Sequence, residues 1–216
     1  MIYKPYREQV KEWPESGCHI LAQFDADSIY VYQAFCPQTA HFAVKNQHFG
    51  DGFSFNRMSW IKPNFLWMMY RSAWATKENQ EIVLGIRIHR GFFDRLLGMA
   101  VPSLMDLHRY SNEQEWQTAV KTSDVRLQWD PDRHPAGNPM NRRAIQLGLR
   151  GDTLREYAME ATISIEDLTP FVSDQRNNRG DKCKNLLTPW ERVYRPSDLQ
   201  TASSAGIDPF PHGLEA

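Results

Sequence analysis

Residues 81–89 alternate regularly between apolar and other side chains, and this pattern limits the fold more than any other feature of the chain. An alternation with a period of two predicts a β-strand with one buried face. Residues 124–130 and 143–150 are also typical of strands, and helix-like segments lie between them at irregular intervals. We therefore expect an α+β fold with a mixed, largely antiparallel sheet and helices packed on it. The buried face of the first strand would carry Ile82, Leu84, Ile86 and Ile88.

The chain has 216 residues, of which 41% are hydrophobic, and this is enough for one sizeable core. We expect residues 18–195 to form a single domain. The polar residues 1–17 would be an N-terminal extension. Residues 196–216 are rich in Ser, Ala, Gly and Pro and would form a loosely ordered C-terminal tail.

Charge and cysteine content exclude several classes of protein. A formal net charge of -1 argues against a protein that coats nucleic acid or membrane through bulk charge, although a local basic groove remains compatible with it. The three cysteines are widely spaced and form no CxxC pair, so we expect reduced thiols and a cytoplasmic location. No apolar run approaches the roughly 20 residues of a membrane span, so we expect no membrane contact.

Residues 57–81 combine large aromatic and cationic side chains and form the strongest candidate site. Aromatic faces stack on bases or nicotinamide, while guanidinium and ammonium groups neutralise phosphates. This composition predicts a nucleotide or nucleic-acid site, with phosphates held by side chains because the sequence contains no glycine-rich phosphate loop. The alternative is that Trp67, Tyr70 and Trp74 pack into the core on one face of a helix over residues 63–74. The predicted ligand-binding residues of this segment are Arg57, Lys62, Trp67, Arg71 and Lys77.

The polar faces of the predicted strands offer a second constellation. If the three strands are neighbours, Gln128 and Gln146 would lie on a platform of amide and guanidinium groups suited to phosphates or base edges. The alternative is a sheet face that is simply exposed to solvent. The other members of the platform would be Arg87, His89, Arg126, Asp130 and Arg150.

Several of these motifs are similar to those of the domain of unknown function 4291 family. They are SIYVYQAF, RMSWIKPNFLWMMYRSAW, DVRLQWDPD, RRAIQLGLRGD and LLTPWERVY, and the resemblance runs from Cys18 to Tyr194. It implies a small, single-domain, intracellular protein. It supplies no catalytic residues, because the family has no established activity.

The order His19, Tyr70, Glu81 is similar to the triad of one branch of ADP-ribosyltransferases. That resemblance implies an enzyme that uses NAD. His19 would bind the nicotinamide ribose, Tyr70 would stack on nicotinamide, and Glu81 would stabilise the oxocarbenium-like transition state. Our leading hypothesis is therefore a nucleotide- or nucleic-acid-directed transferase of this kind. Glu81 is equally well interpreted as a surface carboxylate at the start of a strand.

Two further hypotheses belong to other classes. A non-catalytic module would use the aromatic and basic segment to bind single-stranded nucleic acid or a protein partner. A metal-dependent enzyme would use Asp130, Asp132 and His134 of the DPDRH sequence, although Asp-Pro-Asp is also ordinary turn chemistry and we predict no metal ligands there. Cys36 precedes a proline at a predicted helix start. It would act as a nucleophile only if that helix lowered the pKa of its thiol. The sequence does not predict the oligomeric state.

Overall fold

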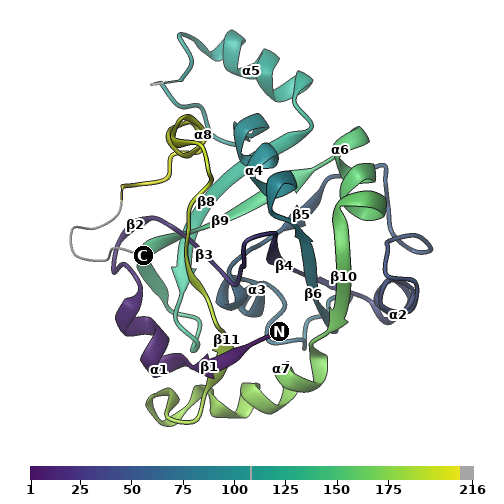
Figure 1. Ribbon diagram of the computed structural model, residues 1–216, viewed down its shortest axis with the longest axis vertical. Coiled ribbons are helices and arrows are strands. Elements are labelled where there is room, and N and C mark those ends of the chain that lie inside the picture. The colour runs from purple at the N-terminus through teal and green to yellow at the C-terminus, as the bar shows by residue number, and fades with distance from the viewer. Residues whose placement is uncertain (108, 210–216) are drawn as a thin grey trace.

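The computed structural model describes residues 1–107 and 109–209 (Figure 1). It confirms a single-domain α+β fold in which most strand pairs are antiparallel. Among the described residues, every helix is too short or too polar to cross a bilayer.

One sheet has three antiparallel strands in the order β10-β6-β4. These are β4 (Ser28–Phe35), β6 (Ile82–His89) and β10 (Thr162–Asp167). The central strand β6 is the one predicted from its alternation. Its Leu84, Ile86 and Ile88 enter one hydrophobic cluster, whereas Val83 enters a second cluster on the opposite face. Both faces of this sheet are therefore covered.

The second sheet is built on the antiparallel hairpin of β8 (Val125–Arg133) and β9 (Pro139–Leu149). β2 (Gly17–Cys18) pairs with β9 in parallel, and β7 (Val101–Pro102) pairs with β8 in parallel. β5 (Ser59–Ile61) pairs with the end of β9 in an antiparallel direction. The hairpin strands are longer than the predicted segments 124–130 and 143–150, because β8 continues to Arg133 and β9 begins at Pro139.

The two sheets meet at Lys62, directly after β5. The backbone N–H of Tyr32 in the middle of β4 donates to the Lys62 carbonyl at 2.7 Å, and the Lys62 N–H donates back at 3.3 Å. We call this pair of hydrogen bonds the seam. It places the Lys62 side chain at the junction of the two sheets.

Helices cover the sheets on several sides (Figure 1). α2 packs on the three-stranded sheet, α3 packs between β4 and β8, and α5 projects at one end of the molecule. The two-stranded pairs β1–β11 and β3–β12 complete the fold. The helices are α1 (Tyr6–Gln9), α2 (Pro37–Asn46), α3 (Phe65–Arg71), α4 (Arg90–Met99), α5 (Glu113–Thr122), α6 (Gly151–Glu156), α7 (Thr169–Arg176) and α8 (Leu199–Ser204). The short strands are β1 (Tyr3–Pro5), β3 (Ile20–Ala22), β11 (Leu187–Pro189) and β12 (Arg192–Tyr194).

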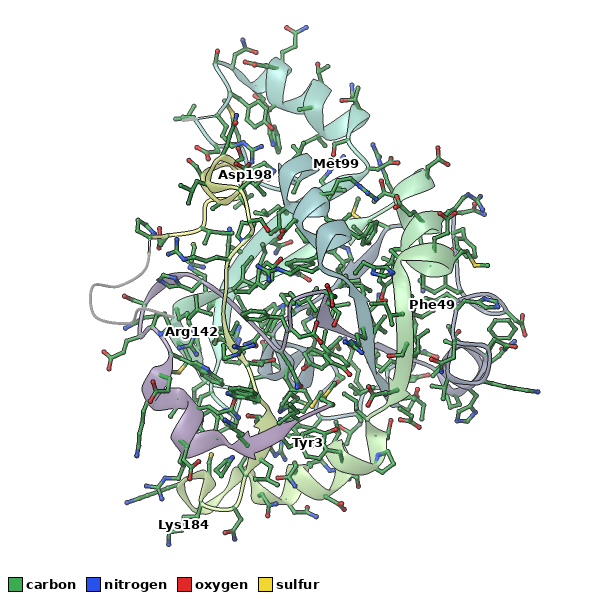
Figure 2. The ribbon with its side chains drawn as sticks, viewed as in Figure 1. Tyr3, Phe49, Met99, Arg142, Lys184 and Asp198 are labelled. Carbon is green, nitrogen blue, oxygen red and sulfur yellow. The ribbon has the colours of Figure 1, made fainter. Side chains whose placement is uncertain are left out.

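The terminal segments are integrated into the fold. In the expected N-terminal extension, β1 pairs with β11, and Trp13 is buried with its indole N–H donating to the Glu191 carbonyl. Arg142, labelled in Figure 2, donates to the Pro14 carbonyl. The described part of the expected tail, residues 196–209, contains α8 and adds side chains to the main core. Residues 210–216 lie outside the described part. The core residues of the tail are Ala202, Ala205 and Ile207.

Candidate functional site

A cavity of about 650 Å³ lies where the two sheets meet α3. Its walls come from β4, β5, α3, the loop before β6 and the middle of the β8–β9 hairpin. We call it the Lys62 cavity. Its lining residues are Gln33, Ala34, Phe35, Arg57, Met58, Ser59, Trp60, Lys62, Trp67, Met68, Arg71, Asn79, Gln80, Gln128, Asp130 and Gln146.

The connection from β5 to α3 is fixed by buried polar contacts. Asn64 caps α3, because its side-chain oxygen accepts from the Trp67 N–H at 2.7 Å. The carboxylate of Glu191 accepts from the Phe65 N–H at 2.6 Å and from the Asn64 amide at 3.3 Å. These bonds anchor the helix start that follows Lys62.

Lys62 is the most unusual group of the cavity, because only 6% of it is exposed. Its Nζ donates to the Trp60 carbonyl at 3.0 Å. The ammonium group has three N–H donors, and within the described residues this is its single hydrogen bond. Burial lowers the pKa of the Lys62 ammonium to about 7, with Arg71 adding to the shift and Asp130 opposing it. This shift favours the neutral amine of Lys62 relative to a lysine in water.

The floor of the cavity contains a carboxylate held between two amides. Gln128 and Gln146 lie opposite each other on the β8–β9 hairpin. The Gln128 Nε2 donates to one oxygen of Asp130 at 2.9 Å, and the Gln146 Nε2 donates to the other at 2.7 Å. Both amides are thereby oriented. Within residues 1–107 and 109–209 no protein donor reaches either Oε1 atom, so both remain available as acceptors.

Two arginines supply positive charge to the cavity. Arg57 and Arg71 both line it and both are exposed. Neither guanidinium makes an ion pair or hydrogen bond with another described residue. Unpaired guanidinium groups that border a cavity are suited to bind phosphate or carboxylate.

The aromatic residues of the predicted helix have different environments. Trp67 is 4% exposed, lines the cavity, and stacks on Tyr70 with 5.4 Å between ring centroids. Tyr70 faces outward, where the Arg133 guanidinium lies 3.8 Å from its ring centre. Trp74 is in the core, in contact with Phe65.

The predicted helix over residues 63–74 is shorter in the structure because the backbone turns left-handed after Arg71. Three consecutive residues have positive φ angles: Ala73 at 49°, Trp74 at 57° and Ala75 at 63°. This turn directs Trp74 into the core, away from the face that carries Trp67 and Tyr70. Trp67, Tyr70 and Trp74 therefore do not share one helix face as predicted, because Trp74 lies beyond the end of α3.

The structure gathers most of the predicted ligand-binding residues at one place. Lys77 is exposed and lies outside the cavity. The expected platform is divided, because β8 and β9 are neighbours but β6, with Arg87 and His89, belongs to the other sheet. The predicted residues that line the cavity are Arg57, Lys62, Trp67, Arg71, Gln128 and Gln146.

The three residues of the ADP-ribosyltransferase comparison do not line the Lys62 cavity. His19 is buried between β2 and β3, and burial lowers its pKa. Tyr70 packs on the outer side of Trp67. Glu81 accepts from the Asn79 N–H at 2.8 Å, and its other oxygen is buried without a hydrogen-bond partner in the described protein.

The DPDRH residues have separate structural partners. Asp132 is buried and ion-paired with Arg142 at 2.6 Å, whereas Asp130 faces the two glutamines. His134 accepts from the Ala136 N–H in the turn of the hairpin. In the part of the chain that the structure describes, no group of three His, Cys, Asp or Glu side chains is arranged to bind a metal ion.

Cys36 lies in a neighbouring pocket of about 290 Å³ that shares Arg57 and Asn79 with the Lys62 cavity. It is the N-cap residue of α2, and hydrogen bonds from Thr39 lower the pKa of its thiol. The expected position at the helix start is confirmed.

Sequence reasoning did not anticipate several lining residues. Gln33 donates to Ser59 at 2.8 Å and accepts from Tyr157 at 2.8 Å, so a buried network on β4 supports the wall of the cavity. Asp130 was expected on the polar platform and, in the alternative, as a metal ligand, but not as an acceptor for two glutamine amides. Alternation along β8 places Gln128 and Asp130 on one face, whereas the contact with Gln146 depends on the register between β8 and β9.

The sequence matches the family model described as Domain of unknown function (DUF4291) over residues 19–194. Because this match covers more than half of the chain, the chain belongs to that family, as its motifs suggested. No curated protein matches the sequence. The family description names no activity.

Proposed function

We propose that this member of the family is an enzyme that binds a nucleotide in the Lys62 cavity and uses the Lys62 amine in catalysis. The observation that carries the proposal is the burial of Lys62 beside two unpaired arginines. Burial of a charged lysine without an ion-pair partner costs folding free energy, and the neutral amine avoids this cost. Neutral, buried lysines can act as nucleophiles or general bases in enzymes.

The other walls of the cavity fit a nucleotide. Phe35, Trp60 and Trp67 offer aromatic surface for a base, and Arg57 and Arg71 offer cations for phosphate. The oriented amides of Gln128 and Gln146 offer acceptors for ribose hydroxyls or an exocyclic amine. Clefts with apolar walls and a few convergent polar groups are the usual sites for small ligands.

The proposal differs from the predicted NAD-dependent transfer in the residues that form the catalytic site. His19, Tyr70 and Glu81 lie outside the cavity, so they are left out of the proposed catalytic group, and NAD is kept as one ligand to be tested. Cys18, Cys36 and Cys183 are free thiols, which supports a reducing, cytoplasmic location. Cell fractionation that recovered the protein outside the cytoplasm would refute that location.

Calorimetry with AMP, ATP, NAD and a short single-stranded RNA tests binding. We expect at least one nucleotide to bind, and Arg71→Met to weaken its affinity about tenfold, or ~1.4 kcal/mol. Arg143→Met is the matched control, because Arg143 is an exposed arginine outside the cavity. The proposal fails if no ligand binds or if both variants have equal effects.

Turnover separates an enzyme from a binding module. After incubation with the bound nucleotide, chromatography should show a product that Lys62→Met abolishes while nucleotide binding persists. Binding without any conversion would favour the non-catalytic module. Unchanged turnover in Lys62→Met would remove Lys62 from the mechanism.

A further inference from the structure

The charge of the Lys62 cavity limits the ligand that it can take. The lining residues with ionisable side chains are Arg57, Lys62, Arg71 and Asp130. When Lys62 is neutral, two guanidinium groups and one carboxylate remain, with a net charge of about one positive unit. This balance complements a ligand with a single phosphate group better than one with a highly charged triphosphate.

The floor of the cavity also limits the ligand. The amide nitrogens of Gln128 and Gln146 both donate to Asp130, which leaves their oxygens as acceptors. Acceptors in a cavity select donors, and hydroxyl groups are the donors of a sugar. A sugar that carries one phosphate therefore satisfies both the floor and the arginines.

The Lys62 amine completes this arrangement. It is 6% exposed, lines the same cavity, and donates only to the Trp60 carbonyl among the described groups. Arg71 lies near enough to influence its charge, so a phosphate at Arg71 would hold the rest of the ligand beside the amine. A neutral amine beside a sugar reacts with its open-chain carbonyl group.

We propose that the Lys62 cavity binds the open-chain form of a ribose-sized aldose phosphate and that Lys62 forms an imine with its aldehyde carbon. The amine nitrogen forms a bond to that carbon, the carbonyl oxygen leaves as water with the two amine protons, and no oxidant or reductant takes part. A phosphate and a ribose-sized sugar that can open to an aldehyde are both present in free ribose 5-phosphate and in a base-free nucleotide of a nucleic acid. This inference rests on the proposed function in one respect: both place a phosphate group at Arg57 and Arg71.

Reductive trapping tests the imine. The full-length protein is incubated with ribose 5-phosphate and cyanoborohydride, which reduces an imine to a stable secondary amine, and the adduct is located by peptide mapping. We expect modification of Lys62 at least tenfold faster than of Lys77, the exposed lysine used as the internal reference. Trapping should proceed near pH 7, because burial lowers the pKa of Lys62 to about 7. Labelling of exposed lysines with Lys62 unmodified would overturn the proposal, and this readout needs no variant.

Matched ligands test the role of the phosphate. Ribose without phosphate should label Lys62 at least tenfold more slowly, and phosphoribitol, which has no carbonyl, should compete without forming an adduct. Equal labelling by ribose and ribose 5-phosphate would overturn the assignment of Arg57 and Arg71. The same trapping is carried out with an oligonucleotide that contains one base-free site. The substrate that labels Lys62 faster, this oligonucleotide or ribose 5-phosphate, is the class of ligand that the cavity takes.

The two proposals can fail separately. Nucleotide binding in calorimetry with an unmodified Lys62 would overturn the imine and leave the proposed function standing. Trapping at Lys62 without binding of any nucleotide would support the imine and overturn the nucleotide proposal. Lys62→Met, checked for folding by thermal melting, should abolish the mapped adduct.

Discussion

A charged side chain that is almost wholly removed from water lowers the stability of the fold around it. Lys62 is in this position, because its pKa is lowered from 10.5 to about 7 in the folded protein. Below pH 7 the ammonium is charged in both the folded and the unfolded chain, and the full desolvation penalty is present. As the pH rises above 7, the folded protein releases this proton before the unfolded chain does, so the penalty decreases.

This difference predicts how stability depends on pH. Between pH 7.5 and pH 9, the free energy of unfolding of the wild type should rise with pH more steeply than that of Lys62→Met. The difference in slope should be up to ~1.4 kcal/mol per pH unit. Urea denaturation of both proteins at the two pH values measures the difference. Lys77→Met is the control, because Lys77 is exposed and should not change the slope. Parallel slopes for the wild type and Lys62→Met would show that Lys62 titrates normally.

At the scale of the element, α3 depends on polar groups from distant parts of the chain. Asn64 caps the helix from within, while Glu191, far away in sequence, accepts from the Phe65 N–H. The helix has seven residues, too few for a stable helix in isolation. Its stability therefore comes from these caps and from packing.

Removal of the cap should be measurable. We expect Asn64→Ala to lower the free energy of unfolding by ~1–2 kcal/mol, because the Trp67 N–H loses its acceptor. Asn64→Ser keeps a capping oxygen and should recover most of this loss. Chemical denaturation of the three proteins gives the comparison. An equal loss in Ala and Ser variants would mean that the amide contact with Glu191, not the cap, is the important interaction.

Local patterns predicted the elements better than their boundaries and junctions. The alternation of β6 is a property of adjacent residues, so the strand was predicted correctly, although both of its faces are covered and not one alone. The end of α3 depends on positive φ angles at Ala73, Trp74 and Ala75, which the identity of these residues does not favour. The composition of residues 57–81 indicated a cluster of cations and aromatics, but the burial of Lys62 depends on β4, which is distant in sequence.

At the scale of the whole molecule, the described part of the C-terminal segment helps to hold the core together. The described part of the C-terminal segment packs Ile207 into the main core, and the Trp129 indole N–H donates to the Ala205 carbonyl at 2.9 Å. Neither contact is visible in the composition of that segment, which is rich in small and polar residues. Small residues can still pack closely where a short helix lies against another helix, as α8 lies against α4.

Removal of residues 196–216 should therefore destabilise the domain. We expect a loss of at least ~2 kcal/mol from Ile207 and the two alanines, and a red shift of tryptophan fluorescence as Trp129 gains access to water. Urea denaturation followed by fluorescence measures both effects. Leu199→Ala is the control within the same segment, because Leu199 is 79% exposed and should change stability little. Unaltered stability after the truncation would show that α8 contributes nothing to the core.

The seam at Tyr32 and Lys62 links the two sheets at the residue that carries the amine. The two backbone amide protons of the seam can exchange with solvent deuterium only when the sheets separate locally. A ligand that contacts β4 on one sheet and β8 or β9 on the other would hold the seam closed. The exchange of these two protons would then report occupancy of the Lys62 cavity, whichever ligand fills it.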